Sequence, residues 1–118
     1  MTRVIDGDTI VLSNGERVRY IGVDTPERDE PFYLIARKFN RDLVEGRQIR
    51  IELDIQERDR YGRLLGYVYV DTLFVNATLV RDGMAVVATY PPNVKYVSLF
   101  TSLQKQARSN GLGLWSKE

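Results

Sequence analysis

Acidic side chains gather in the first quarter of the sequence, at positions where the residue pattern predicts the ends of short strands. Asp6 and Asp8 flank a glycine, and Asp24 and Glu27 stand on either side of a Thr-Pro step. Proline fixes its own φ and drives the preceding residue into an extended conformation, so Asp24 and Glu27 should lie on a stiff, irregular segment. Acids on rigid strand ends suit metal binding and the handling of water.

The sequence contains no cysteine and no histidine. This composition excludes disulfides, thiol catalysis, a Cys/His zinc site, a Ser-His-Asp triad and a histidine general acid or base. Catalysis must therefore use carboxylates, Arg, Lys, Tyr, backbone groups or a metal ion held by oxygen. Oxygen ligands favour Ca²⁺, Mg²⁺ or Mn²⁺.

The acids are candidates for a Ca²⁺ site. Asn14-Gly15 predicts a hairpin whose register brings Asp8 opposite the early twenties, and hence near Asp24. Two carboxylates, the backbone carbonyl of Thr25 and several waters would supply the roughly six to eight oxygens that Ca²⁺ takes. An Asp-Gly pair is also a common turn signal, so each aspartate taken alone is explained as a turn residue. The cluster as a whole favours a metal site.

Two arginines are candidates for holding a phosphate beside these acids. Arg19 lies on the strand that leads to Asp24. A bulge or twist at Gly22 would bring the side chains of Arg19 and Asp24 to one site. Arg63 follows a glycine in a charged loop, where a ligand can approach the backbone closely. Tyr61 offers a flat face on which a base could stack. An exposed arginine is ordinarily only a solvated surface charge.

Short strands and helices must position these residues. The pattern predicts strands over 3–5, 9–12, 17–23, 48–53, 65–70 and 84–88, and helices over 29–45, 75–82 and 96–110. The helix faces predicted to be buried carry Phe32, Ile35, Ala36, Phe39, Leu43, Val75, Leu79, Val80, Leu99, Phe100, Leu103 and Ala107, with Trp115 as a packing anchor. This α+β pattern, mainly β, predicts a small Greek-key barrel of the oligonucleotide-binding (OB) type with about three helices, in one domain over 1–118.

The formal net charge of +1 does not identify a nucleic-acid partner, which would have to meet a local basic patch. Thirteen arginines against four lysines fit phosphate binding, but they fit thermal adaptation or base composition equally. No apolar stretch is long enough to span a bilayer. No signal peptide is present, although a processed start would hide one, and the compartment stays undetermined.

Five blocks of sequence resemble the thermonuclease (staphylococcal nuclease) family in order and spacing, from about Arg3 to Ser116. The blocks are Ile5-Asp6-Gly7-Asp8-Thr9, Val18-Arg19-Tyr20-Ile21-Gly22-Val23-Asp24-Thr25-Pro26-Glu27, Asp59-Arg60-Tyr61-Gly62-Arg63, Val75-Asn76-Ala77-Thr78-Leu79-Val80-Arg81-Asp82-Gly83 and Gly113-Leu114-Trp115. The resemblance implies a Ca²⁺-dependent nuclease that cleaves the P–O5′ bond of DNA and RNA, with preference for single-stranded or flexible substrate. It also implies a five-stranded OB-type barrel with three helices.

The resemblance further implies a role for each matching residue. The expected Ca²⁺ ligands are Asp8, Asp24 and the backbone carbonyl of Thr25, with Asp6 close to the metal but not a direct ligand. The expected catalytic residues are Glu27, which orients or deprotonates the attacking water, and the phosphate-binding pair Arg19 and Arg63. The expected nucleotide contacts are Arg60, Tyr61 and Tyr90.

Two departures from the staphylococcal enzyme stand near this site. The segment between Pro26 and Ile49 is several residues shorter, so most of a lysine-bearing loop is missing. Ala88 stands where a second nucleotide-pocket tyrosine would align. We expect a monomer that acts on DNA and RNA without an obligate protein partner. The resemblance is compatible with a secreted or cell-envelope location.

The alternative function is a non-catalytic OB-fold module that binds nucleic acid or another protein, because fold alone does not choose between the two. A binding module has no reason to keep Asp8, Asp24, Glu27, Arg19 and Arg63 together. A purely structural Ca²⁺ site would leave the two arginines unexplained. The sequence therefore favours a nuclease.

Overall fold

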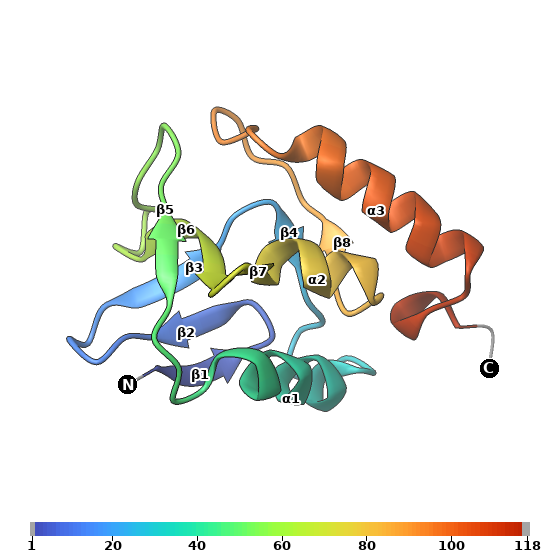
Figure 1. Ribbon diagram of the computed structural model, residues 1–118, viewed down its shortest axis with the longest axis horizontal. Helices are drawn as coiled ribbons and strands as arrows, with labels where there is room; N and C mark the ends of the chain where they lie inside the picture. Colours follow the sequence, from blue (N-terminus) through green and yellow to red (C-terminus); the bar gives the residue numbers. More distant parts are fainter. Residues whose placement is uncertain (1, 117–118) are drawn as a thin grey trace.

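The computed structural model describes residues 2–116 as a curved sheet with helices packed against it (Figure 1). The sheet runs β1 (Arg3–Asp6), β2 (Thr9–Val11), β3 (Arg17–Tyr20), β6 (Leu64–Val70), β5 (Arg50–Glu52), and β7 (Leu73–Phe74) pairs with β6. A second, two-stranded sheet joins β4 (Val23–Asp24) to β8 (Val86–Val87). The helices are α1 (Tyr33–Val44), α2 (Val75–Arg81) and α3 (Val97–Ser109), followed by a 3₁₀ turn, η1 (Gly113–Trp115).

The predicted α+β class, OB-type barrel and three helices are confirmed, although the strands are shorter and more numerous than expected. The pairing of β3 with β6 is parallel, whereas the other strand pairs are antiparallel. In the described part of the chain β1 and β5 form the two edges of the larger sheet, so the barrel is partly open. Thr2 bridges this seam, because its carbonyl accepts the Gly46 N–H at 3.0 Å and its hydroxyl donates to the Arg47 carbonyl at 3.1 Å.

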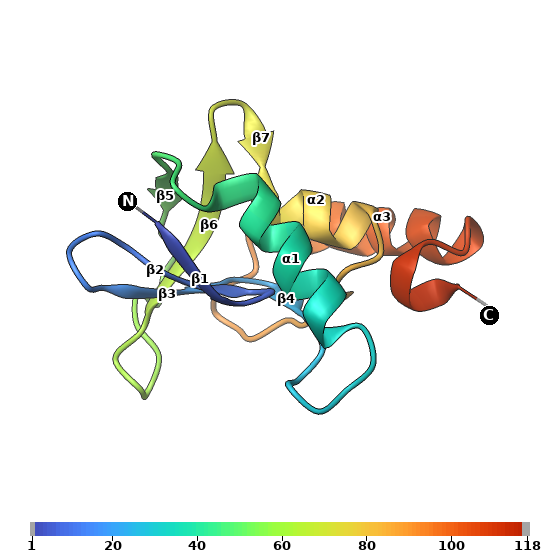
Figure 2. The ribbon, with the colours of Figure 1, turned by 90° about the horizontal axis from the view of Figure 1, so that it is seen from below.

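The hydrophobic core lies between the sheet and the helices. Helix α1 crosses β1, and α2 packs between β6 and α3 (Figures 1 and 2). The fully buried hydrophobic side chains come from the sheet and all three helices, and include Ile10, Val18, Tyr20, Val44, Tyr67, Val68, Val75, Leu79, Val80 and Phe100. Burial of this apolar surface is the main stabilising term of the fold.

Two residues predicted to be buried are exposed. Ile35 on α1 is 52% exposed and Leu99 on α3 is 42% exposed. On α1 the inward face instead includes Asn40, whose Oδ1 accepts a hydrogen bond from the Tyr20 hydroxyl at 2.6 Å and whose Nδ2 donates to the Asp6 carbonyl at 3.0 Å. Asn40 can occupy an inward position because its hydrogen bonds are satisfied there. The buried face of α1 therefore includes Asn40 and leaves Ile35 exposed.

Helix α1 also begins four residues later than predicted, at Tyr33 instead of Asp29. The acids before it form a turn of their own, because the Glu30 N–H donates to the Glu27 carbonyl at 2.9 Å and the Glu30 carboxylate accepts from the Glu27 N–H at 2.6 Å. Phe32 then reverses the chain with a left-handed φ of 72° and no side-chain cap. The predicted strands over 48–53 and 84–88 are likewise shortened, to 50–52 and 86–87.

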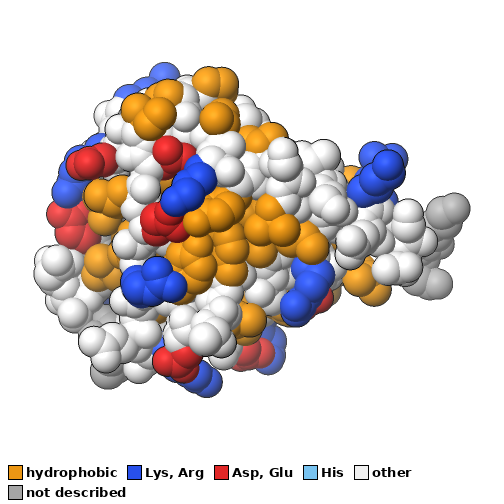
Figure 3. Space-filling model, turned by 45° about the horizontal axis from the view of Figure 1, so that its top comes forward, with side chains coloured by type: hydrophobic (Ala, Val, Ile, Leu, Met, Phe, Trp, Pro, Cys, Tyr) orange, Lys and Arg blue, Asp and Glu red, His pale blue; other side chains and the backbone are white. Residues whose placement is uncertain are grey.

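An aromatic cluster fills the space between β6, β7 and α3. Tyr69 stacks on Phe74 with ring centroids 4.5 Å apart, and Tyr67 meets Tyr96 edge-on at 4.6 Å. Figure 3 shows one face of the molecule, on which hydrophobic side chains gather at the centre with charged ones around them. None of the helices between residues 2 and 116 has the length and apolar character needed to cross a membrane.

Candidate active site

A sharp turn after β3 brings Arg19 and Asp24 to the same side of the chain. The predicted continuous strand over 17–23 is wrong, because Ile21 and Gly22 separate β3 from β4, which pairs with β8 instead. Gly22 has a φ of 82°, and a Cβ at this position would lie 2.6 Å from the Phe100 ring. Only glycine fits this turn without strain.

The turn is held by the side chain of Arg19. Its Nη1 donates to the Tyr20 carbonyl at 2.7 Å and to the Val23 carbonyl at 2.8 Å. Its Nη2 donates to Asp24 Oδ1 at 3.2 Å. Arg19 therefore fixes the backbone across the turn and points its guanidinium group at the site.

Asp8 reaches the same place from the turn between β1 and β2. The predicted hairpin register is confirmed, since Thr9 pairs with Arg19 and the Tyr20 N–H donates to the Asp8 carbonyl at 2.9 Å. Asp8 Oδ2 accepts the Thr25 N–H at 2.9 Å and lies 3.4 Å from Arg19 Nη2. The carboxylates of Asp8 and Asp24 thus converge on one arginine nitrogen, beside the backbone of Thr25.

The positive charge of Arg19 offsets part of the negative charge of Asp8 and Asp24. The Asp8 side chain is buried, whereas that of Asp24 is 41% exposed. Burial raises the pKa of the Asp24 carboxyl; the Arg19 guanidinium opposes the rise, and the negative charges of Asp8 and Glu30 add to it.

The potential ligands that this cluster offers are oxygen atoms, the donor type that hard cations bind. The part of the chain that the structure describes holds no group of three or more Asp, Glu, His or Cys side chains arranged for a metal ion. A cation here would therefore rely on Asp8, Asp24, the carbonyl of Thr25 and water. This all-oxygen set suits Ca²⁺, whose coordination is flexible and commonly includes water.

Glu27 lies on the turn beyond Pro26, three residues from Asp24. Its side chain is exposed, and it lines the same cavity as Asp8, Arg19 and Asp24. An exposed carboxylate at the mouth of a polar cavity is accessible to both water and substrate. This position is compatible with the water-handling role expected for Glu27.

Arg63 enters the site from the distant loop between β5 and β6. Its Nε donates to Asp59 Oδ2 at 2.8 Å, and its backbone N–H donates to Asp59 Oδ1 at 3.0 Å. Tyr61 is 68% exposed, and the guanidinium carbons of Arg60 and Arg63 lie 5.0 and 5.5 Å from its ring centroid. Tyr90 is 70% exposed and lines the same cavity as Tyr61.

The structure brings nearly all the predicted site residues together around one cavity. Its lining includes Asp8, Arg19, Asp24, Thr25, Glu27, Tyr61, Arg63 and Tyr90. Arg60 alone is absent from this lining, but it lines an adjoining cavity that shares Arg19, Tyr61, Arg63 and Tyr90. The two cavities therefore form a continuous polar and aromatic surface.

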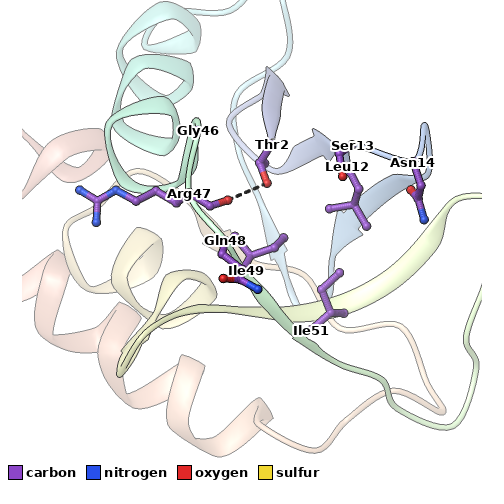
Figure 4. Close-up of a pocket in the computed structure, with 9 residues that line it drawn as sticks. All are labelled: Thr2, Leu12, Ser13, Asn14, Gly46, Arg47, Gln48, Ile49 and Ile51. Atoms are coloured by element: carbon purple, nitrogen blue, oxygen red, sulfur yellow. Dashed lines mark hydrogen bonds between the residues drawn. The ribbon is translucent and has the colours of Figure 1, made fainter.

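A separate cavity lies at the open seam of the barrel (Figure 4). Its charged lining residue is Arg47, and the remaining lining residues are Thr2, Leu12, Ser13, Asn14, Gly46, Gln48, Ile49 and Ile51. Two of these lining residues are joined by the hydrogen bond from the Thr2 hydroxyl to the Arg47 carbonyl (Figure 4). Because no carboxylate side chain of the described residues lines this cavity, it does not combine the groups expected for the site.

Four further residues that line this cavity were not predicted as site residues from the sequence: Thr9, Pro26, Arg28 and Tyr33. The Tyr33 hydroxyl donates to Asp6 Oδ1 at 2.6 Å, and this hydrogen bond raises the pKa of the tyrosine. Tyr33 reaches the cavity because α1 begins at this residue, directly after the short turn that follows Glu27. The sequence feature that could have indicated Tyr33 as a lining residue is the short stretch of chain between Glu27 and the first turn of α1.

A family model and several known proteins match this chain, and these matches agree with one another. The family model described as staphylococcal nuclease homologue matches residues 17–117. The chain is 44% identical to endonuclease YncB of Bacillus subtilis (strain 168), over 99% of this chain and 61% of that protein. It is 41% identical to the SPbeta prophage-derived endonuclease YokF of the same organism, over 99% of this chain and 43% of that protein. It is 39% identical to the thermonuclease of Staphylococcus intermedius, over 98% of this chain and 74% of that protein. The chain thus spans less than two thirds of the two Bacillus proteins.

Proposed function

The chain belongs to the staphylococcal nuclease family, and from this premise we propose that it is a Ca²⁺-dependent nuclease that hydrolyses phosphodiester bonds in DNA and RNA. One observation carries the proposal: two converging carboxylates, an exposed glutamate and two separately anchored arginines line a single cavity. The names of the relatives, endonuclease and thermonuclease, describe the same class of reaction.

Asp8, Asp24 and the carbonyl of Thr25 are the groups that would hold Ca²⁺. When bound, the ion would supply Lewis-acid polarisation of a phosphate oxygen. Asp8 is already held in place by the Thr25 N–H, so one ligand position is preorganised by the backbone. Asp24 is fixed by Arg19 and by the rigid turn at Gly22.

The protein side chains supply the remaining functions. Glu27 would orient or deprotonate the attacking water, because its carboxylate is exposed at the cavity in which Arg19 and Arg63 lie. The two arginines would stabilise the negative charge that builds on the phosphate as the P–O5′ bond is cleaved. Arginine stays protonated in proteins, so we assign both an electrostatic role and not proton transfer.

Substrate selection would depend on the exposed aromatic side chains. Tyr61 and Tyr90 offer faces for unstacked bases, with Arg60 and Arg63 beside the Tyr61 ring. Bases must leave the duplex to stack in this way, which favours single-stranded or flexible substrate. None of the proposed groups requires a 2′-hydroxyl, so DNA and RNA are both expected substrates.

The test is cleavage of single-stranded DNA and RNA by the unmodified protein with Ca²⁺ and with a chelator, beside Glu27→Gln with Ca²⁺. We expect cleavage only with Ca²⁺, 5′-hydroxyl and 3′-phosphate products, and strong impairment of Glu27→Gln. Glu57→Gln removes another exposed carboxylate and should keep full activity. Cleavage that persists in chelator would reject the metal-dependent mechanism. Binding without cleavage under all conditions would favour the non-catalytic module.

A further inference from the structure

A groove lined by arginines runs along the outer side of α1 and β1. Its basic lining residues are Arg3 from β1, Arg28 from the turn before α1, and Arg37 and Arg41 from α1. Its acidic lining residue is Glu45, at the end of the helix. We call this feature the α1 groove. Four positive charges meet one negative charge here, although the whole chain carries a net charge of only +1.

The α1 groove is built by helical periodicity. Tyr33, Arg37 and Arg41 follow one another at intervals of four residues, so they lie along one side of α1, and Glu45 follows just past the end of the helix. The span from Tyr33 to Arg41 is about 12 Å at the rise of an α-helix. That length exceeds one nucleotide step of a strand, so the groove can contact more than one phosphate.

The guanidinium groups of the α1 groove retain donors for a ligand, although Arg28 also interacts with the Tyr33 hydroxyl. Within residues 2–116 none of these four arginines takes part in an ion pair, whereas Arg19, Arg58, Arg63 and Arg81 all do. The side chain of Arg37 is oriented by a 2.9 Å hydrogen bond from its Nε to the Ile5 carbonyl. This bond leaves both Nη atoms of Arg37 free of protein acceptors in the described chain. Arg3, Arg28 and Arg41 are exposed.

The α1 groove is continuous with the candidate active site. Arg28 and Tyr33 line both the groove and the cavity that contains Asp8, Arg19 and Glu27. Figure 2 shows α1 lying across β1, with the connection from β4 joining the N-terminal end of the helix. A strand that leaves the active-site cavity past Arg28 would therefore pass along α1 toward Arg41.

We propose that the α1 groove binds the sugar-phosphate backbone of the nucleic-acid strand that flanks the cleaved phosphate. The proposal rests on the proposed nuclease function and adds a path for the substrate outside the reacting centre. Arginine matches this ligand because its planar group forms bidentate hydrogen bonds to phosphate oxygens. The described lining of the groove offers no exposed aromatic side chain for stacking a base, so binding here should follow the backbone and not the base sequence.

The test is equilibrium binding of a labelled single-stranded oligothymidylate in chelator, where no cleavage is expected. The variant is Arg3→Gln/Arg41→Gln, which removes two exposed charges from the α1 groove. The control is Arg47→Gln/Lys105→Gln, which removes two exposed charges outside it. Thermal melts of each protein check that the fold is retained.

We expect the groove variant to bind the long strand about tenfold more weakly at low salt, and the control to bind as the unmodified protein does. The slope of log affinity against log salt should become shallower by about 1.4, because two phosphate contacts on a single strand are lost. Affinity for a thymidine dinucleotide should stay unchanged, since that ligand does not extend along the groove. Arg41→Glu should weaken binding of the long strand further.

Equal losses in the groove variant and the control would overturn the proposal, as would an equal loss for the dinucleotide. Competition by inorganic tripolyphosphate as effective as competition by the long strand would show a site for small anions instead, and would also overturn it. The nuclease proposal fails separately, through the absence of Ca²⁺-dependent cleavage by the unmodified protein. Binding in chelator reports on the groove in either case.

Discussion

Asp59 holds Arg63 through both oxygens of its carboxylate. Oδ2 accepts the Arg63 Nε–H at 2.8 Å, and Oδ1 accepts the Arg63 backbone N–H at 3.0 Å as well as that of Tyr61 at 3.0 Å. Burial of the Asp59 carboxyl opposes its ionisation, but the hydrogen bonds from Arg63 and Tyr61 outweigh this effect and lower its pKa. The carboxylate therefore stays charged and sets both the loop and the direction of the arginine.

Asp59→Asn should impair cleavage without removing any group that contacts substrate. An amide oxygen still accepts the backbone N–H groups, but the charge that orients the Arg63 side chain is lost. Hydrogen bonds to charged groups are worth about 1.5–3 kcal/mol, so we expect about a 10- to 100-fold decrease in kcat/KM. The control is Glu57→Gln, which removes an exposed carboxylate from the same loop. Equal effects of the two substitutions would show that Asp59 contributes only general loop charge.

Arg63→Lys should lower kcat by about 10²–10³ although the positive charge is kept. Lysine lacks the planar fork that both reaches Asp59 and presents a second pair of donors to phosphate. Arg58→Lys is the matched control, because Arg58 is an exposed arginine of the same loop that pairs with Glu16. Steady-state kinetics on single-stranded DNA measure the difference. Near-normal turnover by Arg63→Lys would remove Arg63 from the phosphate-binding role.

Gly22→Ala should destabilise the turn that joins Arg19 to Asp24. The new Cβ would lie 2.6 Å from the Phe100 ring, and the φ of 82° is unfavourable for any residue with a Cβ. Together these effects should lower the free energy of unfolding by about 2–4 kcal/mol. Gly15→Ala is the control, since Gly15 has a φ of 87° but a methyl group there would meet nothing within 4 Å. Urea unfolding measures the free energy of unfolding of both variants, and the difference between their losses is the cost of the clash with Phe100. Equal losses in the two variants would mean that the Phe100 contact adds no cost to the backbone strain.

Glu52 should make the fold sensitive to acid. Hydrogen bonds from Lys95, Tyr96 and Tyr69 lower the pKa of Glu52 below its ordinary value of 4.5. A lowered folded-state pKa stabilises the native state above the unfolded-state value, and this contribution is lost as the pH falls through the folded-state pKa. As the pH is lowered from about 4.5, the urea concentration at the unfolding midpoint should therefore decrease for the unmodified protein. The decrease should be smaller for Glu52→Gln. Identical pH profiles for the two proteins would contradict this account.

Local signals in the sequence determined the chemistry of the site and part of its geometry. The absence of Cys and His restricted it to oxygen ligands, carboxylates and arginines. Asn14-Gly15 set the hairpin register that places Asp8 beside the strand of Arg19. Such signals are readable because turn chemistry and strand alternation depend on residues that are close in the chain.

Contacts between distant segments decided the rest. The predicted start of α1 at Asp29 was wrong because the Glu27 to Glu30 turn satisfies its own hydrogen bonds. Tyr33, the first residue of the helix, lines both the candidate active-site cavity and the α1 groove. Asn40 took an inward position because Tyr20 and Asp6 offered partners. Asp24 and Thr25 become part of a site only because the hairpin and the turn at Gly22 bring Asp8, Arg19 and Asp24 together. The sequence alone determined which groups are available, and the tertiary structure decided which of them meet, because burial and long-range hydrogen bonds select one arrangement among several locally acceptable ones.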